Sequence, residues 1–249
     1  MSKPFLIIQL RPEDETADNE FSKILEFGEL QSHDVQRLRI EVSGLPELNL
    51  DSYAAIIVGG SPFDLSAPQT EKSEIQLQIE QAFMNLFEEI KRRDFPFLGC
   101  CSGNGLLGAY CGASISRKFG EPVGGATVSL TDVGKQDPLL AGLPASFRVM
   151  LGHKEACDDV PPGCELLVSG HACPVQMFRL RENIYATQFH PEGDAEGFAV
   201  RIEAYKHHGY FPALEADQLL QRIAAEETPE AKLILKRFVQ RYRDQAQVA

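Results

Sequence analysis

Continuous apolar runs alternate along this chain with longer amphipathic stretches. Residues 5–10, 54–58 and 95–98 form short apolar runs, which are typical of strands covered on both faces. Residues 20–30 and 70–93 carry apolar side chains at steps of three and four, which predicts two helices. Strands and helices in this alternation predict an α/β fold with a mostly parallel central sheet and helices on both of its faces.

The second half of the chain has a different texture, with short β-rich runs between Gly and Pro residues. The links between these runs are too short for crossover helices, so we expect an antiparallel extension of the sheet. The acidic residues 11–20 are predicted to form a solvated loop. We expect one domain over residues 1–249, with a core of about residues 1–200 and a helical extension over about 200–249. The remaining predicted strands are residues 35–42, 126–130, 147–151, 165–169, 175–180 and 183–189, and the remaining helices are 198–207, 212–225 and 229–241.

The 249 residues carry a formal net charge of −12. This acidic excess argues against nucleic acid or an anionic membrane as the main partner, because both favour basic surfaces. The chain shows no signal-peptide pattern and no apolar run of 18 residues, so we expect a cytoplasmic protein with six free thiols. Adjacent Cys100 and Cys101 do not give the ligand spacing of a zinc site, so the sequence predicts no metal.

The segment 99–103, GCCSG, follows an apolar run and precedes a helical pattern. We interpret it as a sharp turn between a buried strand and a helix, which lifts Cys101 above the edge of the sheet. The dipole and the free N–H groups of the helix N-terminus favour an anion, so we expect the Cys101 pKa to fall from about 8.5 to about 3.5–7.5. Cys101 would then be a thiolate nucleophile. The alternative is a buried cysteine that packs as a small hydrophobe.

Two further segments supply chemistry that complements a nucleophile. Gly59 and Gly60 follow a predicted strand, where loop N–H groups can stabilise an oxyanion, although a plain turn could have the same sequence. His190 and Glu192 follow the last predicted strand and point to the same side of an extended backbone, so the carboxylate can hold one ring nitrogen. The other nitrogen could exchange a proton with Cys101. The alternative for His190 is a capping or core histidine.

Together, the Gly59-Gly60 loop, the GCCSG turn and the QFHPE segment ending at Glu192 resemble the class I (triad-type) glutamine amidotransferase family. The resemblance runs over about residues 5–192. It implies a flavodoxin-like fold, which is a three-layer sandwich. It also implies an enzyme that hydrolyses the γ-amide of glutamine without a cofactor. Ammonia would pass to an acceptor, which could belong to a separate synthetase subunit, and a homo-oligomer is compatible with the pattern.

The resemblance also implies a role for each matching residue. Cys101 would attack the γ-amide carbon, His190 would act as base and then as acid, and Glu192 would orient His190. The oxyanion hole would consist of the N–H groups of Gly60 and Ser102. The glutamine substrate is implied by the family resemblance alone, whereas the nucleophile, the base and the oxyanion donors also follow from the residue types.

Candidate substrate contacts are Gly59, Gly103, Gly105, His153 and Gln188. The sequence departs from the family at Gly105, where the family commonly has a Gln that helps to bind glutamine. Around His153 only the His of the family's Ser-His-Gly-Asp segment is retained, and a surface-loop histidine is an alternative there. These departures leave two alternatives open: a γ-glutamyl peptidase or hydrolase with the same triad, and a non-catalytic binding or regulatory protein on the same fold.

Overall fold

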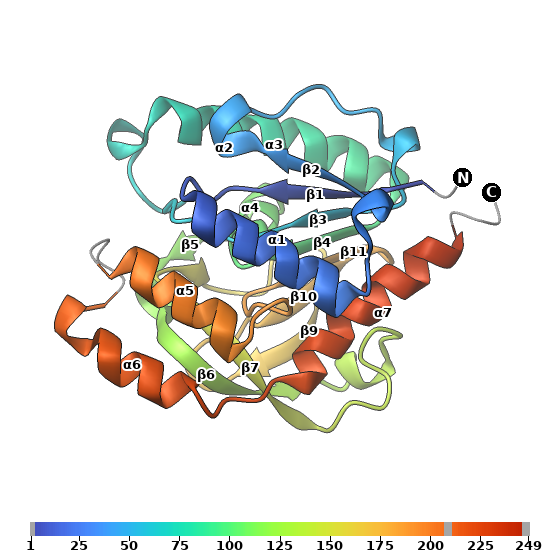
Figure 1. The fold of residues 1–249 in the computed structure, drawn as a ribbon. Helices are drawn as coiled ribbons and strands as arrows, with labels where there is room; N and C mark the ends of the chain where they lie inside the picture. The colour runs from blue at the N-terminus through green and yellow to red at the C-terminus, as the bar shows by residue number, and fades with distance from the viewer. Residues whose placement is uncertain (1–2, 207–210, 246–249) are drawn as a thin grey trace.

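The computed structural model describes residues 3–206 and 211–245 and contains one nine-stranded mixed sheet with strand order β2-β1-β3-β4-β11-β10-β9-β6-β7 (Figure 1). Neighbouring strands from β2 to β11 are parallel, and from β11 to β7 they are antiparallel. The parallel strands are β1 (Phe5–Gln9), β2 (Val35–Arg39), β3 (Ile56–Val58), β4 (Phe97–Cys100) and β11 (Ile184–Thr187). The antiparallel extension comprises β6 (Glu121–Leu130), β7 (Ser146–His153), β9 (Cys164–Gly170) and β10 (Met177–Leu180), and β5 (Ile115–Ser116) pairs separately with β8 (Ala156–Cys157).

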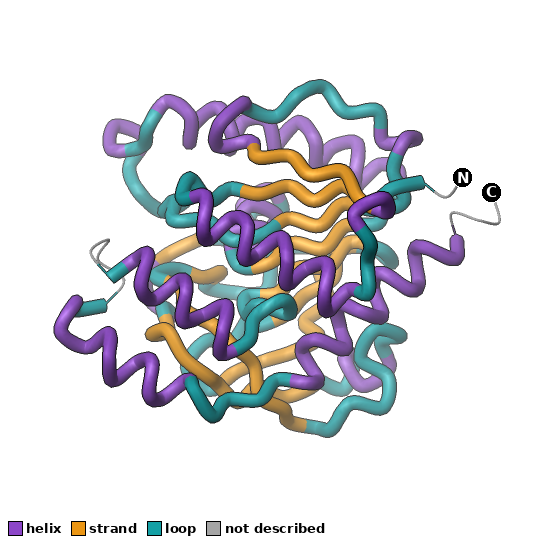
Figure 2. The backbone as a smooth tube through the Cα atoms, in the orientation of Figure 1, coloured by secondary structure: helices purple, strands orange, loops and turns teal. Residues whose placement is uncertain are grey.

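Helices cover both faces of the sheet, and the strands run between them in Figure 2. One apolar cluster joins one face to α1 and α7, and a second joins the other face to α3 and α4. A smaller cluster lies under α5 and α6. The helices are α1 (Asp14–Gly28), α2 (Ile40–Ser43), α3 (Glu74–Arg93), α4 (Ser102–Tyr110), α5 (Ala195–Tyr205), α6 (Ala216–Ile223) and α7 (Pro229–Gln245), and single 3₁₀ turns lie at Ser32–Asp34, Leu50–Ser52, Gln69–Glu71, Arg117–Phe119, Gly134–Gln136 and Ala213–Glu215.

The predicted fold class is confirmed, with a parallel core, an antiparallel extension and helices on both faces. The predicted acidic loop at residues 11–20 is wrong, because α1 begins at Asp14. Its acidic first turn suits the positive end of the helix dipole, and its buried side includes Glu20. The acidic run therefore supplies both the first turn of a helix and one buried carboxylate, Glu20.

Several predicted boundaries shift. The strand predicted at residues 35–42 ends at Arg39, where the chain turns into α2. Helix α3 begins at Glu74 rather than near Thr70, because Ser73 is the N-cap and its side chain accepts a hydrogen bond from the Gln76 N–H. The predicted helix 198–207 corresponds to α5, and its last predicted residue, 207, lies outside the described part of the chain.

Gly99 allows the close packing of β4 against the first turn of α4. A methyl group at this position would lie 2.7 Å from the carbonyl carbon and oxygen of Gly103, which are backbone atoms that cannot rotate away. We expect Gly99→Ala to lower the free energy of unfolding by about 1–3 kcal/mol, as overpacked sites do. Urea unfolding measures this change. Gly103→Ala is the control, because its methyl group would approach Val58 no closer than 3.3 Å; an equal loss in both variants would contradict the packing argument.

Candidate active site

Cys101 occupies a strained turn between β4 and α4. Its backbone angles, φ 53° and ψ −93°, lie in a region that non-glycine residues rarely adopt, and such strain costs about 1–3 kcal/mol. The Cys101 N–H donates to the Thr187 carbonyl oxygen over 2.7 Å, which ties the turn to the end of β11. The predicted strand, turn and helix around Cys101 are therefore confirmed.

The pairing of β4 with β11 brings His190 to the same pocket as Cys101. Cys100 is the register partner of Thr187, and the chain beyond β11 is fixed by a hydrogen bond from the His190 N–H to the Met150 carbonyl, 2.9 Å. Cys101 and His190 both line one cavity, although they are 89 positions apart in the sequence. His190 is 3% exposed, so the ring is enclosed by protein.

Glu192 holds the His190 ring as the residue spacing predicted. His190 Nδ1 donates to Glu192 Oε1 over 2.6 Å, and Arg201 Nη2 in α5 donates to the same oxygen over 3.0 Å. Burial opposes ionisation of Glu192, but His190 and Arg201 outweigh it and lower the Glu192 pKa. For His190, burial and Arg201 outweigh the attraction of Glu192 and lower the pKa, so the ring is neutral at neutral pH.

The expected thiolate at Cys101 is wrong for this conformation. Burial, reinforced by Glu192, raises the pKa of Cys101 to about 11, and Arg11 only partly opposes this effect. Cys101 is half-buried and lines two small cavities, and there the loss of hydration has a larger effect on its pKa than the helix dipole on which the expectation was based. The resting centre therefore holds a neutral thiol beside a neutral imidazole, and Gln188 Nε2 lies 4.0 Å from the sulfur.

The predicted oxyanion donor Gly60 has a hydrogen-bond partner already. Its N–H donates to Glu20 Oε2 over 3.2 Å, and the same oxygen accepts a 2.6 Å hydrogen bond from Arg11 Nε. Arg11 also donates to the Tyr205 hydroxyl and lines the cavity that holds Cys101. In this conformation a buried carboxylate therefore occupies the Gly60 N–H, and an oxyanion would have to displace it.

The predicted donor Ser102 has a different environment. Ser102 and Gly103 open α4, where no preceding helical turn supplies carbonyl partners for their N–H groups. The Ser102 hydroxyl lies 2.8 Å from the Ser61 hydroxyl, which joins the turn to the loop after β3. This arrangement suits an anion next to Cys101, because N–H groups at a helix start favour negative charge.

A second cavity adjoins Cys101 on the side of α4. It is lined by residues that include Gly105, His153 and Gln188, and its volume is about 40 Å³, enough for about two or three water molecules. Glu155 narrows it, because its carboxylate accepts hydrogen bonds from the N–H groups of Leu65 (2.6 Å) and Ser66 (2.8 Å). The loop after β3 would have to move for a molecule of glutamine size to enter.

His153 reaches this cavity, but both of its ring nitrogens contact protein oxygen atoms. Nδ1 lies 3.0 Å from the Glu155 carbonyl oxygen, and Nε2 lies 3.1 Å from Glu121 Oε2. The predicted substrate candidates Gly59 and Gly103 have packing contacts. A side chain at Gly59 would collide with the Glu20 carboxylate, and one at Gly103 would touch Val58.

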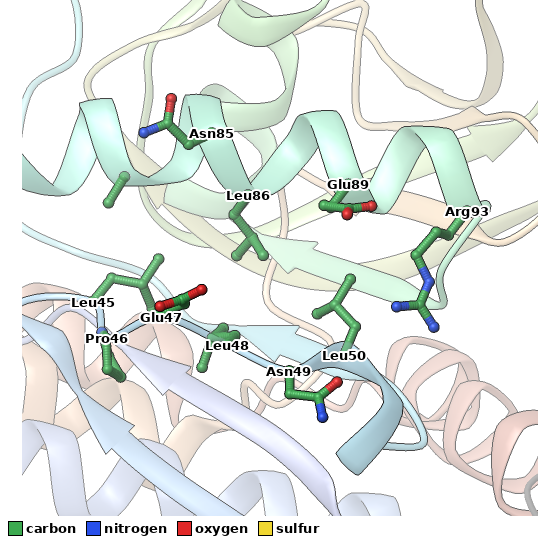
Figure 3. A pocket seen from close by; sticks show the side chains of 11 residues that line it. Leu45, Pro46, Glu47, Leu48, Asn49, Leu50, Asn85, Leu86, Glu89 and Arg93 are labelled. Carbon is green, nitrogen blue, oxygen red and sulfur yellow. The ribbon is translucent and has the colours of Figure 1, made fainter.

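A further cavity lies away from Cys101. It has a volume of about 470 Å³ and lies between the loop Leu45–Leu50 and α3, with Asn85, Leu86, Glu89 and Arg93 on the helix side (Figure 3). None of its lining residues is a cysteine or histidine. This cavity is therefore separate from the two cavities that Cys101 lines.

The sequence reasoning missed four charged residues that shape the centre. Arg11, Glu20, Glu155 and Arg201 come from four segments of the chain, and their partners are known only once the sheet is assembled. Glu20 offered one local signal, because it lies on the apolar side of the α1 pattern. A charge at such a position is rarely buried without a partner.

Comparisons with known proteins agree with this fold. A family model described as "Glutamine amidotransferase class-I" matches residues 22–203. Among curated proteins, a subunit of the glutamine-hydrolyzing GMP synthase of Haloarcula marismortui is 36% identical over 100 residues, which are 40% of this chain and 52% of that protein. The glutamine-hydrolyzing GMP synthase of Caldicellulosiruptor saccharolyticus is 34% identical over 98 residues, which are 39% of this chain and 19% of that protein. The chain thus spans only part of the length of these relatives.

A crystal structure of a glutamine amidotransferase from Thermotoga maritima shares the fold, with a TM-score of 0.77 and 22% identity, over 98% of this chain and 100% of that one. A glutamine amidotransferase from Methylobacillus flagellatus has a TM-score of 0.71 and 17% identity, over 96% and 95%. The structure is an α/β protein with a cysteine at a strand-to-helix turn and a His-x-Glu pair just beyond the adjacent strand. The chain belongs to the class I glutamine amidotransferase family. Among the described residues, no helix is long and apolar enough to cross a membrane.

The raised Cys101 pKa predicts how the resting protein reacts with iodoacetamide. Only the thiolate is reactive, so a pKa near 11 leaves little reactive sulfur at neutral pH, and the alkylation rate should rise about tenfold per pH unit from 7 to 10. Peptide mass mapping identifies the alkylated cysteine, and Cys101→Ala removes its signal. A rate that is already constant between pH 6 and pH 8 would instead indicate the stabilised thiolate.

Proposed function

We propose that this chain hydrolyses the γ-amide of glutamine through a triad of Cys101, His190 and Glu192 and delivers the ammonia to an acceptor. The observation that carries the proposal is the shared cavity of Cys101 and His190, with Glu192 bonded to the far side of the ring. Membership of the class I glutamine amidotransferase family supports the substrate.

Neutral resting groups require that proton transfer accompanies attack. As Cys101 Sγ bonds to the amide carbon, its proton passes to His190, and Glu192 stabilises the imidazolium that forms. The carbonyl oxygen takes up negative charge, for which the N–H of Ser102 is available at the start of α4. The N–H of Gly60 would join it once the oxyanion displaces Glu20.

Collapse of the tetrahedral intermediate breaks the carbon–nitrogen bond. His190 returns its proton to the leaving nitrogen, which departs as ammonia, and a γ-glutamyl thioester remains on Cys101. His190 then removes a proton from water, the hydroxide oxygen bonds to the thioester carbon, and the sulfur leaves with the proton from His190. The products are glutamate and the original thiol.

The substrate contacts proposed for this reaction are Gly59, Gly103, Gly105, His153 and Gln188. Gly105 offers no side chain to a substrate amide, where the family commonly has a Gln that helps to bind glutamine. This departure favours a second candidate, a γ-glutamyl peptidase or hydrolase with the same triad. One curated relative is itself a subunit of a glutamine-hydrolyzing GMP synthase, which for the first candidate supports an acceptor on a separate chain.

Ammonia and glutamate release distinguish these candidates. We expect the purified protein to release both from glutamine, and turnover of γ-glutamyl dipeptides alone would support the second candidate. Cys101→Ala should abolish either activity with an unchanged melting temperature, whereas Cys111→Ser is the matched control and should retain it. Activity that survives in Cys101→Ala would refute the triad, and silence of the wild type with its acceptor chain present would favour a non-catalytic protein.

Glu192→Gln tests the orienting carboxylate separately. The amide keeps the shape of Glu192 but cannot balance an imidazolium, so kcat should fall about 10²- to 10⁴-fold while KM changes little. Steady-state kinetics measure both parameters. A melting curve checks that the loss of the ion pair between Arg201 and Glu192 does not unfold the protein. A kcat within twofold of the wild type would contradict the role of Glu192.

A further inference from the structure

Three side chains with metal-binding atoms meet behind the small cavity beside Cys101. Glu121 at the start of β6 and His153 at the end of β7 are register partners, and Cys173 lies in the connection between β9 and β10. A carboxylate oxygen, a ring nitrogen and the thiol sulfur of these residues all lie within 4.8 Å of one another. His153 and Cys173 are buried, and the Glu121 side chain is only 9% exposed. The bond-making steps proposed for hydrolysis do not involve this cluster.

The orientation of His153 points to a cation at this place. The Glu155 carbonyl oxygen can only accept a hydrogen bond, so the nitrogen facing it, Nδ1, carries a proton. A backbone carbonyl in this position typically fixes the ring of a metal-binding histidine. The opposite nitrogen, Nε2, faces the Glu121 carboxylate at 3.1 Å. Two acceptor atoms can face each other at this distance only if a proton or a metal ion lies with them.

The neighbouring Gln176 offers a further oxygen. Its Nε2 donates to Glu121 Oε2 over 2.6 Å, which places the amide directly on the cluster. Its Oε1 is buried and has no hydrogen-bond partner among the described residues, and Gln176 itself is 0% exposed. Buried oxygens of this kind usually have a partner, which can be a water molecule or a metal ion.

We propose that Glu121, His153 and Cys173 bind one divalent cation of the zinc class, with the fourth position taken by Gln176 Oε1 or water. Nitrogen, oxygen and sulfur around zinc lie about 2.0–2.3 Å from the metal, and so about 3.3–3.6 Å from one another in a tetrahedron. The atoms of Glu121, His153 and Cys173 lie within 4.8 Å of one another, so they would approach by at most about 1.5 Å to reach this geometry. The Gln176 amide would have to turn to present Oε1, because its Nε2 now faces Glu121. A carboxylate, a thiolate and a neutral imidazole also balance the two positive charges, which suits a buried site.

The cation would act as a structural clamp and not as a participant in hydrolysis. It would join β6, β7 and the β9–β10 connection at the wall of the cavity. The Gln176 carbonyl accepts a 2.8 Å hydrogen bond from the Gln188 N–H, and the Gln188 side chain approaches Cys101. Metal-bound His153 would support this wall, and in the metal-bound protein this role would replace the substrate contact proposed for it above.

Cobalt and zinc binding test the proposal on the intact chain. Metal-free protein should bind one Co²⁺ with a sulfur-to-cobalt charge-transfer absorption, and Zn²⁺ should displace it. Zinc should also raise the melting temperature, because a ligand that binds only the folded state stabilises it. Cys173→Ser should remove the charge-transfer band and weaken zinc binding by at least about 100-fold.

Cys111→Ser is the matched control, because Cys111 and Cys164 form another thiol pair, 3.8 Å apart, that could bind zinc. The band must survive in Cys111→Ser. Glu121→Gln provides an independent variant, which should weaken zinc binding and keep the sulfur band at saturating cobalt. The proposal is overturned if no cobalt–sulfur band forms, if the band is lost in Cys111→Ser, or if Cys173→Ser binds zinc as tightly as the wild type. These readouts do not depend on glutamine hydrolysis.

Discussion

The pairing of β4 with β11 is the constraint on which the candidate active site depends. It places Cys100 opposite Thr187, and the Cys101 N–H donates a hydrogen bond to the Thr187 carbonyl oxygen. With the turn after β4 fixed in this way, the chain beyond β11 carries His190 into the cavity of Cys101. A register shift of one residue would turn these side chains to the opposite faces of the sheet. The buried core of the parallel strands therefore determines the geometry of the site.

Charge placement decides the state of that centre. The helix N-terminus favours an anion at Cys101, but the loss of water around the sulfur is the larger effect on its pKa, and the nearby Glu192 adds to it. Arg201 and His190 keep the Glu192 carboxylate ionised, and Glu20 occupies the Gly60 N–H. In the resting conformation Glu192 is therefore paired with Arg201, and Glu20 is paired with Arg11 and the Gly60 N–H. An oxyanion that binds at Gly60 has to displace Glu20.

The sequence revealed the parts of this structure that depend on local patterns. Continuous apolar runs predicted β1, β3 and β4, and Cys101, His190 and Glu192 were proposed as site residues because turns and strand ends have recognisable residue types. The buried ion pair of Arg11 and Glu20 could not be predicted from the local sequence pattern. Arg11 lies in the loop after β1, Glu20 lies in the second turn of α1, and the Glu20 carboxylate also accepts a hydrogen bond from Gly60 in the loop after β3. The division into a core and a helical extension stays a prediction. The Glu121 cluster was missed because its members come from three segments.

Labelling with a glutamine-like chloroketone tests the central claim most directly, because this reagent needs both recognition as glutamine and a nucleophilic sulfur. The account predicts one covalent adduct per chain, located at Cys101 by peptide mass mapping, suppressed by excess glutamine and much slower in His190→Ala. An adduct on another cysteine, or labelling of Cys101 that neither glutamine nor the loss of His190 affects, would contradict it.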